Sequence, residues 1–280
     1  MIAIALGFAA ALCWGLADFL GGIRTRALTL ALVLLASQAT SMAAAALIVA
    51  VGQLDPPSWG EIGPALAAGV CYLFGIAALY RALAVGTMSV ISPISASGAA
   101  ALPVVVGIAA GERPGEIQYL GMAVVLVGVV LATRAPEAEG AKSPREAMWL
   151  AAIAAAGIGG FYVGIDASVE DVSPFWALLA TRASAFALLC AALVVVRPRL
   201  GSAEGVLPAL ALIGLLDVGA NICFALGTET GLLSIVSVLG SLFPVATVVL
   251  ARAVLDERLV RIQAVGVAAS LAGVGLIAAG

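Results

Sequence analysis

Three ionisable side chains lie within long apolar stretches of the sequence, namely Asp18, Arg182 and Asp217. A charge is costly in an apolar environment, so such residues usually face a partner or a water-filled cavity. Arg182 and Asp217 could form a static ion pair that locks two helices together. They could instead face a central cavity, where a zwitterionic substrate needs one positive and one negative partner. Asp18 could line the same cavity or reach the membrane interface. The sequence leaves these alternatives open.

Polar and aromatic residues at helical spacing accompany these charges. Trp14 precedes Asp18 by four residues, and Asn221 follows Asp217 by four, so each pair shares one helix face. The aromatic side chains could line a cavity or fill a core. The predicted substrate-binding residues are Trp14, Asp18, Gln38, Tyr72, Tyr162, Arg182, Asp217 and Asn221.

The residue types argue against several other chemistries. The chain has no histidine, so neither a zinc site nor a histidine-based acid–base centre is expected. Four cysteines lie far apart in apolar stretches, without CxxC spacing, at Cys13, Cys71, Cys190 and Cys223. We therefore predict no catalytic residue, no metal and no cofactor. A membrane-embedded enzyme would need a motif such as His-Glu-x-x-His, a channel would need repeated polar rings, and a nucleic-acid-binding protein would need a basic patch. The sequence shows none of these three features.

The elements that position these residues are predicted to be membrane helices. Hydrophobic residues make up 63% of the chain and charged residues 10%, whereas a soluble domain is about 25% charged. A membrane span needs about 20 mostly apolar residues. Ten stretches qualify, at approximately 2–22, 28–51, 62–84, 88–110, 116–133, 147–167, 174–196, 205–227, 231–251 and 260–279. The predicted fold class is an all-α integral membrane protein with ten transmembrane helices.

The second half of the sequence repeats the first. At a shift of 145 residues, Glu112-Arg113 falls on Glu257-Arg258. At a shift of 144, the run LLASQ at 34–38 falls on LLATR at 178–182, which makes Gln38 the counterpart of Arg182. We predict one five-helix repeat at 1–133, a polar linker at 134–146 and a second five-helix repeat at 147–280. Because five is odd, the second repeat must be inverted, an architecture shared by many secondary transporters.

Small residues and prolines predict how the helices pack and bend. Two glycines seven residues apart recur in spans five and ten, as Gly121 and Gly128 and as Gly266 and Gly273. Small residues allow close helix approach in lipid, so we expect these spans to pack together, away from the cavity. Prolines kink helices, and the predicted hinges in spans four and nine are Pro93, Pro103 and Pro244.

A family resemblance follows from the motifs before spans five and ten. Gly111-Glu112-Arg113 and Asp256-Glu257-Arg258 are each followed by a glutamine and a glycine, and Trp14-Gly15 lies in the first span. Together they resemble the drug/metabolite transporter superfamily, in its ten-helix EamA-type branch. From their loop position, we expect the two glutamates to cap span five or ten.

The resemblance implies a secondary transporter that moves small metabolites by alternating access. The expected activity is export of neutral or aromatic amino acids. The alternatives are export of lipophilic cations and multiple drugs, or facilitated transport without a coupling ion. Protons are a candidate coupling ion, and without histidine they would have to use a carboxylate such as Asp18 or Asp217.

Charge in the loops predicts the orientation. Lysines and arginines are concentrated in the loops after spans one, three, five, seven and nine, whereas the opposite loops contain only Arg113. The positive-inside rule places the first set in the cytoplasm and both termini outside. We expect a multi-pass protein of a bacterial inner membrane, whose partners are a small-molecule substrate and the lipid bilayer. Two fused repeats favour a monomer.

Overall fold

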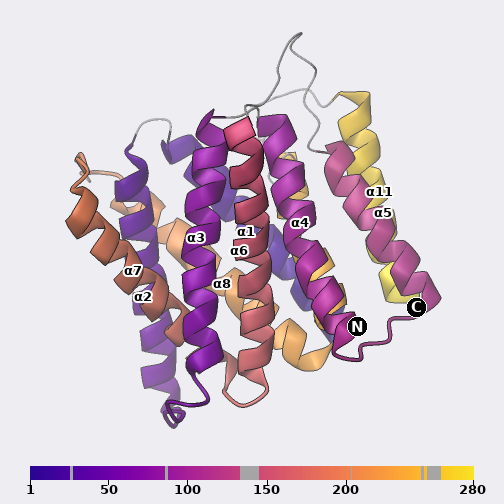
Figure 1. The fold of residues 1–280 in the computed structure, drawn as a ribbon, viewed down its shortest axis with the longest axis horizontal. Helices are drawn as coiled ribbons and strands as arrows, with labels where there is room; N and C mark the ends of the chain where they lie inside the picture. Colours follow the sequence, from indigo (N-terminus) through magenta and orange to yellow (C-terminus); the bar gives the residue numbers. More distant parts are fainter. Residues whose placement is uncertain (26–27, 86–87, 133–144, 203, 247–248, 251–259) are drawn as a thin grey trace.

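The computed structural model describes residues 1–280 except 26–27, 86–87, 133–144, 203, 247–248 and 251–259. In the described part of the chain every regular element is a helix (Figure 1). The ten described helices are α1 (Ile2–Thr25), α2 (Leu30–Gly52), α3 (Gly63–Val85), α4 (Met88–Ala109), α5 (Glu116–Ala132), α6 (Arg145–Val169), α7 (Pro174–Val196), α8 (Leu207–Thr230), α9 (Leu233–Gly240) and α11 (Arg261–Ala279). The predicted all-α fold and the count of ten helices are confirmed.

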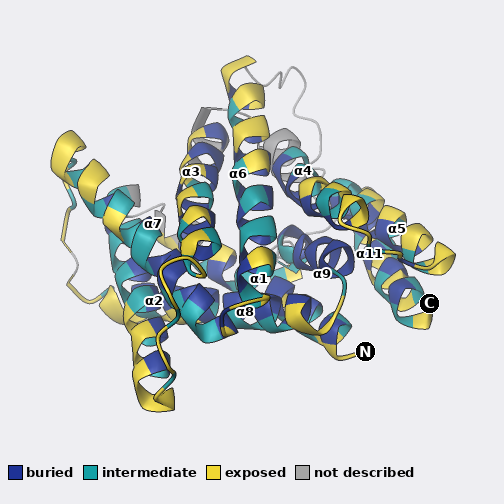
Figure 2. Ribbon diagram, turned by 60° about the horizontal axis from the view of Figure 1, so that its bottom comes forward, coloured by how far each residue is buried: buried dark blue, intermediate teal, exposed yellow. Residues whose placement is uncertain are grey.

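Length and composition are those of membrane spans. Within the described ranges, α1, α2, α6, α7, α8 and α11 are long and apolar enough to cross a bilayer, and α3, α4, α5 and α9 carry shorter apolar segments. Exposed residues follow the outward faces of the helices (Figure 2). Large apolar side chains such as Leu47, Phe74 and Val105 are among them. A bilayer offers these faces an apolar surrounding, which water would not.

The ninth predicted span, 231–251, is not one continuous helix. Helix α9 ends at Gly240, and residues 241–242 form a turn before the helix resumes. Pro244 explains the break, because its ring clashes with the carbonyl of the residue four positions earlier, which is Gly240. The Ser241 hydroxyl donates to the Val238 carbonyl at 2.7 Å and so satisfies one acceptor near the break. By contrast, α4 stays helical through Pro93 and Pro103.

The ends of α2 and α7 match across the repeat. Thr29 and Ser173, 144 residues apart, are the N-caps, and each side chain accepts a hydrogen bond from the backbone N–H three residues later. Gln53 and Arg197, again 144 residues apart, are the C-caps, and both adopt the left-handed conformation with φ 49°. The repeat therefore extends from sequence to backbone conformation.

The repeat relation groups eight of the helices into two bodies that lie as two layers (Figures 1 and 2), and packing of α2 on α7 and of α4 on α9 joins the bodies to each other. In body A, α1 and α2 pack on α8, and α1 also packs on α9. In body B, α6 and α7 pack on α3, and α6 also packs on α4. When each helix is replaced by its counterpart in the other repeat, each packed helix pair of body A becomes a packed helix pair of body B. Each body therefore combines two helices of each half of the chain.

Helices α5 and α11 pack against each other beside the two bodies (Figure 1). A Cβ atom added to Gly121 would lie 2.8 Å from the Gly273 carbonyl oxygen, and one added to Gly128 would lie 2.9 Å from the Gly266 carbonyl oxygen. The contacts run in opposite directions along the two helices, as inverted repeats require. The structure thus places all four predicted packing glycines at one crossing, away from the cavity described below.

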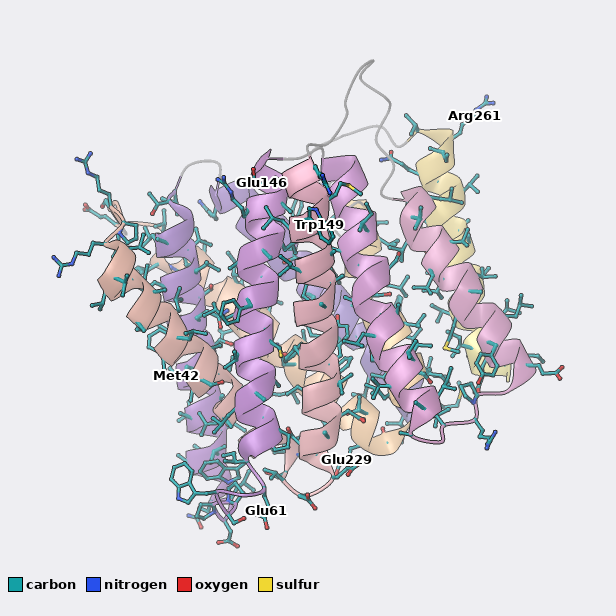
Figure 3. All side chains as sticks on the ribbon, in the orientation of Figure 1. Met42, Glu61, Glu146, Trp149, Glu229 and Arg261 are labelled. Carbon is teal, nitrogen blue, oxygen red and sulfur yellow. The ribbon has the colours of Figure 1, made fainter. Side chains whose placement is uncertain are left out.

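The two ends of the molecule differ in the loops that they carry. Both chain termini lie at one end, here called the terminal end (Figure 1), together with Glu61 and Glu229 (Figure 3). Glu146 and Arg261 lie at the other end (Figure 3), which is also where α1 finishes with Arg24. We call this second end the basic end.

Candidate functional site

A cavity of about 80 Å³ lies between the two bodies. Body A lines it with α1, α2 and α8, and body B lines it with α3 and α6. A single water needs roughly 10–15 Å³ by the same kind of measure, so the cavity can hold more than one small group. Its position between two exchange-related bodies is where inverted-repeat transporters bind their substrates.

The cavity extends from the middle of the molecule toward the basic end. Asp18 and Gly21 belong to the last third of α1, and Val33 and Leu34 to the first turns of α2. Both helices meet the basic end at these residues, since α1 finishes there and α2 begins there. Leu79, near the end of α3, has the same placement. The cavity therefore lies closer to the basic end than to the terminal end.

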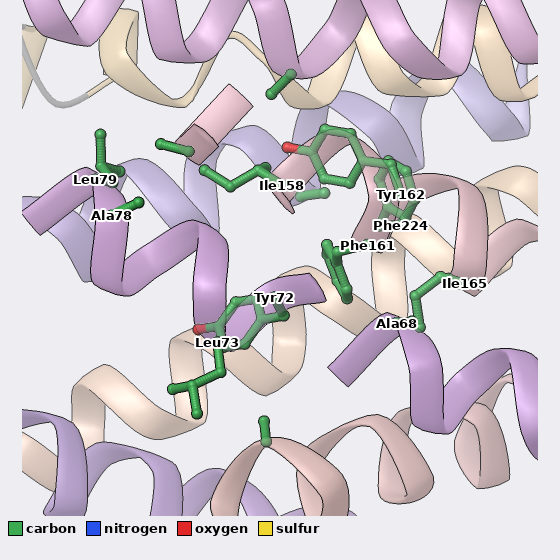
Figure 4. Close-up of a cluster of buried hydrophobic side chains, with 14 of the residues drawn as sticks. Ala68, Tyr72, Leu73, Ala78, Leu79, Ile158, Phe161, Tyr162, Ile165 and Phe224 are labelled. Carbon is green, nitrogen blue, oxygen red and sulfur yellow. The ribbon is translucent and has the colours of Figure 1, made fainter. Parts of the chain in front are cut away.

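Aromatic rings from both bodies close the cavity toward the terminal end. Tyr162 stacks on Phe224 with ring centroids 4.5 Å apart, and Trp14 contacts both rings at 5.6 and 5.7 Å. Phe161 lies beside them, and its ring meets that of Tyr72 edge to face at 5.4 Å (Figure 4). Such pairs stabilise by about 0.5–1.5 kcal/mol beyond the area that they bury. This cluster forms a floor that separates the cavity from the terminal end.

A buried polar network connects the bodies beside the cavity. Arg182 of α7 places Nη1 3.0 Å from a carboxylate oxygen of Asp217 on α8, and the same Nη1 donates to Gln38 Oε1 at 3.2 Å. The Gln38 amide donates to the Tyr72 hydroxyl at 3.2 Å. Asp217 also accepts from Ser41 Oγ at 3.1 Å.

Arg182 is enclosed on every side. Its exposed fraction is 0%, and its guanidinium carbon lies 4.3 Å from the centre of the Tyr72 ring, within the range of a cation–π contact. It does not line the cavity. In this state Arg182 therefore acts as an ion-pair partner of Asp217, and its charge is not offered to a substrate.

Asp18 differs from Asp217 in having no such partner. It lines the cavity and keeps exposed surface although it lies inside the bundle. Within the described residues, no side chain forms an ion pair or hydrogen bond with its carboxylate. Asp18 and Asp217 together provide two carboxyl groups and Arg182 one guanidinium, so the region has one carboxyl group in excess. That excess suits a cation.

Two hydrogen bonds connect the bodies at the terminal end, and we call this pair the latch. The backbone N–H groups of Leu233 and Ser234, which begin α9, donate to the two carboxylate oxygens of Glu112 at 2.5 and 3.1 Å. The expectation that Glu112 caps span five or ten is therefore wrong: it caps α9 of the other repeat. A helix N-terminus carries unpaired N–H groups and partial positive charge, which a carboxylate satisfies. Glu257 and Arg258, the second copy of the motif, lie outside the described residues.

The structure places the predicted site residues in two groups. Cavity-lining positions are taken by Trp14, Asp18, Gln38, Tyr72, Tyr162 and Asp217. Arg182 and Asn221 lie behind the wall, where the Asn221 amide donates to the Asp217 side chain at 3.1 Å. Of the predicted hinges, Pro103 and Pro244 are buried, and the side chain of Pro93 lies outside the description.

Sequence reasoning missed several contributors. Ser41 shares the helix face of Gln38, three residues away, and that spacing could have identified it. Phe161, Ile158, Ile213 and Phe243 line the cavity as apolar residues in apolar helices, and no sequence signal separates them from core residues. Across the described residues, no group of three or more acidic, cysteine or histidine side chains is arranged to hold a metal ion.

Comparisons with known proteins agree with this architecture. The family model of the EamA-like transporter family matches residues 145–279. One crystal structure of a protein is similar over 98% of this chain and 95% of its own, with a TM-score of 0.79 and 20% identity, which supports the fold. The comparison with curated proteins finds no match. The match covers the second repeat of this ten-helix apolar chain, and it indicates a membrane transporter of the drug/metabolite type.

Proposed function

We propose that the protein is a secondary transporter that carries small organic cations with an apolar or aromatic body by alternating access. The observation that carries the proposal is the unpaired Asp18 carboxylate in a cavity walled by aromatic rings. A carboxylate supplies the charge for an ammonium group, and aromatic faces attract a desolvated cation by about 2 kcal/mol or more. Trp14, Tyr72, Phe161 and Tyr162 supply these faces.

The same geometry argues against the amino-acid substrate that the sequence favoured. A zwitterion needs a cation for its carboxylate, and the cation that the sequence predicted for this role, Arg182, is enclosed and bonded to Asp217. An amine without a carboxylate needs no positively charged partner. The lipophilic-cation alternative therefore fits this state of the cavity better. We expect cytoplasmic loops at the basic end, and export would then start from the state seen here.

Thermal shift of the detergent-purified protein tests the proposal with three probes. They share a phenyl ring on a short carbon chain and differ in the charged groups attached to it. Phenethylamine carries the amine alone, hydrocinnamate the carboxylate alone, and phenylalanine both. A ligand at 100 times its dissociation constant stabilises the folded state by about 2.7 kcal/mol. We expect phenethylamine to raise the melting temperature, and phenylalanine to raise it less at equal concentration.

Asp18→Asn is the decisive variant, because it keeps the shape and removes the charge. A hydrogen bond to a charged group contributes about 1.5–3 kcal/mol, so phenethylamine affinity should fall by about tenfold or more. Asp55→Asn, on an exposed loop, is the matched control and should leave the affinity unchanged. Equal phenethylamine binding by both variants would show that Asp18 is not the cation site. A larger shift with phenylalanine than with phenethylamine would restore the amino-acid hypothesis.

A further inference from the structure

Arg182 is buried with much of its hydrogen-bonding capacity unused. Nη1 serves both Asp217 and Gln38, whereas Nε and Nη2 have no hydrogen-bond partner. Buried polar groups are nearly always satisfied, and an unpaired N–H on a charged group is especially costly. One N–H bond of Nε and one of Nη2 run parallel within the guanidinium plane, so they form the fork that receives both oxygens of a carboxylate. The unused edge of Arg182 therefore has the shape of a carboxylate site.

The position of Arg182 relates it to the cavity through the repeat. Gln38 and Arg182 are repeat counterparts, and they contact each other at 3.2 Å. Two equivalent residues can touch only where the axis that relates the repeats passes between them. Gln38 lines the present cavity, and Arg182 lies across the axis from it. When the bodies exchange roles, the cavity opens on the side of Arg182.

The same exchange changes the surroundings of Arg182, while its contact with Gln38 on the axis is kept. At the shift of 144 residues Tyr72 corresponds to Leu216, so the contact between Gln38 and Tyr72 corresponds to one between Arg182 and Leu216. Leucine cannot accept a hydrogen bond. Leu216 lies one residue before Asp217, about 100° around α8. In the opposite state Arg182 thus faces an apolar side chain where Gln38 now bonds to a hydroxyl, and this contact offers its Nε and Nη2 no acceptor.

We propose that Arg182 binds the carboxylate of a small organic anion in the opposite access state, where the cavity faces the terminal end. The two states then present opposite charges, Asp18 toward the basic end and Arg182 toward the terminal end. At the terminal end the cavity then presents the positive charge of Arg182, which does not retain an organic cation. An organic carboxylate can bind there instead while the cavity returns to face the basic end. This inference rests on the alternating access of the proposed function and is independent of the ligand of Asp18.

Calorimetric titration of the full chain in detergent tests the proposal, with hydrocinnamate as the carboxylate probe and phenethylamine measured in parallel. Glu112→Gln weakens the latch at the terminal end and should populate the opposite state. We expect it to tighten hydrocinnamate binding by about tenfold and to weaken phenethylamine binding. Arg182→Gln installs the residue of the first repeat and should lower hydrocinnamate affinity by about tenfold or more, alone and combined with Glu112→Gln.

Controls keep each outcome decisive. Arg145→Gln, an exposed arginine that begins α6, should leave hydrocinnamate affinity unchanged. If Arg182→Gln fails to fold, Arg182→Gln with Asp217→Asn leaves no unpaired buried charge, and circular dichroism checks its helices. The proposal is overturned if hydrocinnamate binds neither wild type nor Glu112→Gln, or binds equally without Arg182. If only the Glu112→Gln effect is missing, the carboxylate site belongs to the present state and its assignment to the opposite state is wrong. A wild-type protein that binds hydrocinnamate through Arg182 but does not bind phenethylamine would refute the proposed function and leave this inference standing.

Discussion

At the scale of single residues, the charges inside the bundle have different surroundings and hence different roles. Asp217 is held by Arg182, Ser41 and Asn221, whereas Asp18 has only the cavity beside it. Breaking a buried ion pair leaves an uncompensated charge, and that cost exceeds the net contribution of the intact pair. Asp217 is therefore predicted to matter for stability and Asp18 for binding.

Asp217→Asn should destabilise the protein by about 3 kcal/mol, the lower end of the range for removing one partner of a buried pair. The lower end applies because the Asp217 side chain borders the cavity and is 11% exposed. Unfolding in a denaturant series in detergent measures the loss. Arg182→Gln added to Asp217→Asn should recover part of the stability, because no unpaired charge is left. A double variant less stable than both single variants would contradict the ion-pair assignment.

At the scale of elements, close approach of backbones determines which helices pair. Helices α5 and α11 cross where two glycines of each meet, and a Cβ atom on Gly266 would collide with the backbone of Leu131 and Ala132. Helix association in lipid depends on such packing, because lipid tails are as apolar as the helix surface. A single methyl group at the crossing is therefore enough to separate the helices locally.

Gly266→Ala should destabilise the protein by about 1–3 kcal/mol, the usual cost of overpacking a tight contact. Gly275→Ala is the matched control on the same helix, since a Cβ atom there meets nothing within 4 Å. The control should be neutral or slightly stabilising, because alanine favours helix over glycine. Thermal unfolding of both variants under one detergent condition makes the comparison. Equal melting temperatures would contradict the packing described for α5 and α11.

At the scale of the whole molecule, two bodies related by repeat exchange enclose a cavity that faces one end. Under the proposed alternating access, contacts between the bodies, not those within them, change when the cavity comes to face the other end. At the terminal end these contacts are the aromatic floor and the hydrogen bonds from α9 to Glu112. The motif that carries the family resemblance thus joins the two bodies, a role that its position next to α5 does not suggest.

Glu112→Gln should make the terminal end more accessible. The amide keeps one acceptor oxygen and turns its NH2 group toward a backbone donor, so one hydrogen bond to α9 is lost and the other loses its charge. A loss of about 1.4 kcal/mol corresponds to a tenfold shift between states. A cysteine at position 228, where Thr228 is buried near the end of α8, reports the shift through its labelling rate with a membrane-impermeant maleimide. The four native cysteines are replaced by serine in this background.

We expect labelling to speed up by about tenfold in Glu112→Gln. Glu116→Gln changes an exposed glutamate in the first turn of α5 and should leave the rate unchanged. Equal rates in the two variants would show that Glu112 does not hold the terminal end closed.

The sequence alone was enough to predict the helices, the repeat and most of the polar and charged residues around the cavity. Hydropathy and length are local properties, and in lipid every backbone polar group must bond within its own helix, so spans could be located from the chain itself. Charges within such spans identified Asp18, Arg182 and Asp217 because few positions in a bilayer tolerate them. The repeat register also made Gln38 and Arg182 counterparts before any contact was known.

Only the tertiary structure decided which of these residues face the cavity. Whether Arg182 is offered to a substrate or held by Asp217 depends on how α7 of one body meets α8 of the other, and no local pattern encodes that meeting. The same holds for Glu112, whose partners at Leu233 and Ser234 are more than a hundred residues away along the chain. Hydropathy determines that a segment is buried in the membrane. Packing between the two bodies determines what each buried side chain touches, and therefore whether it binds a ligand or holds the fold.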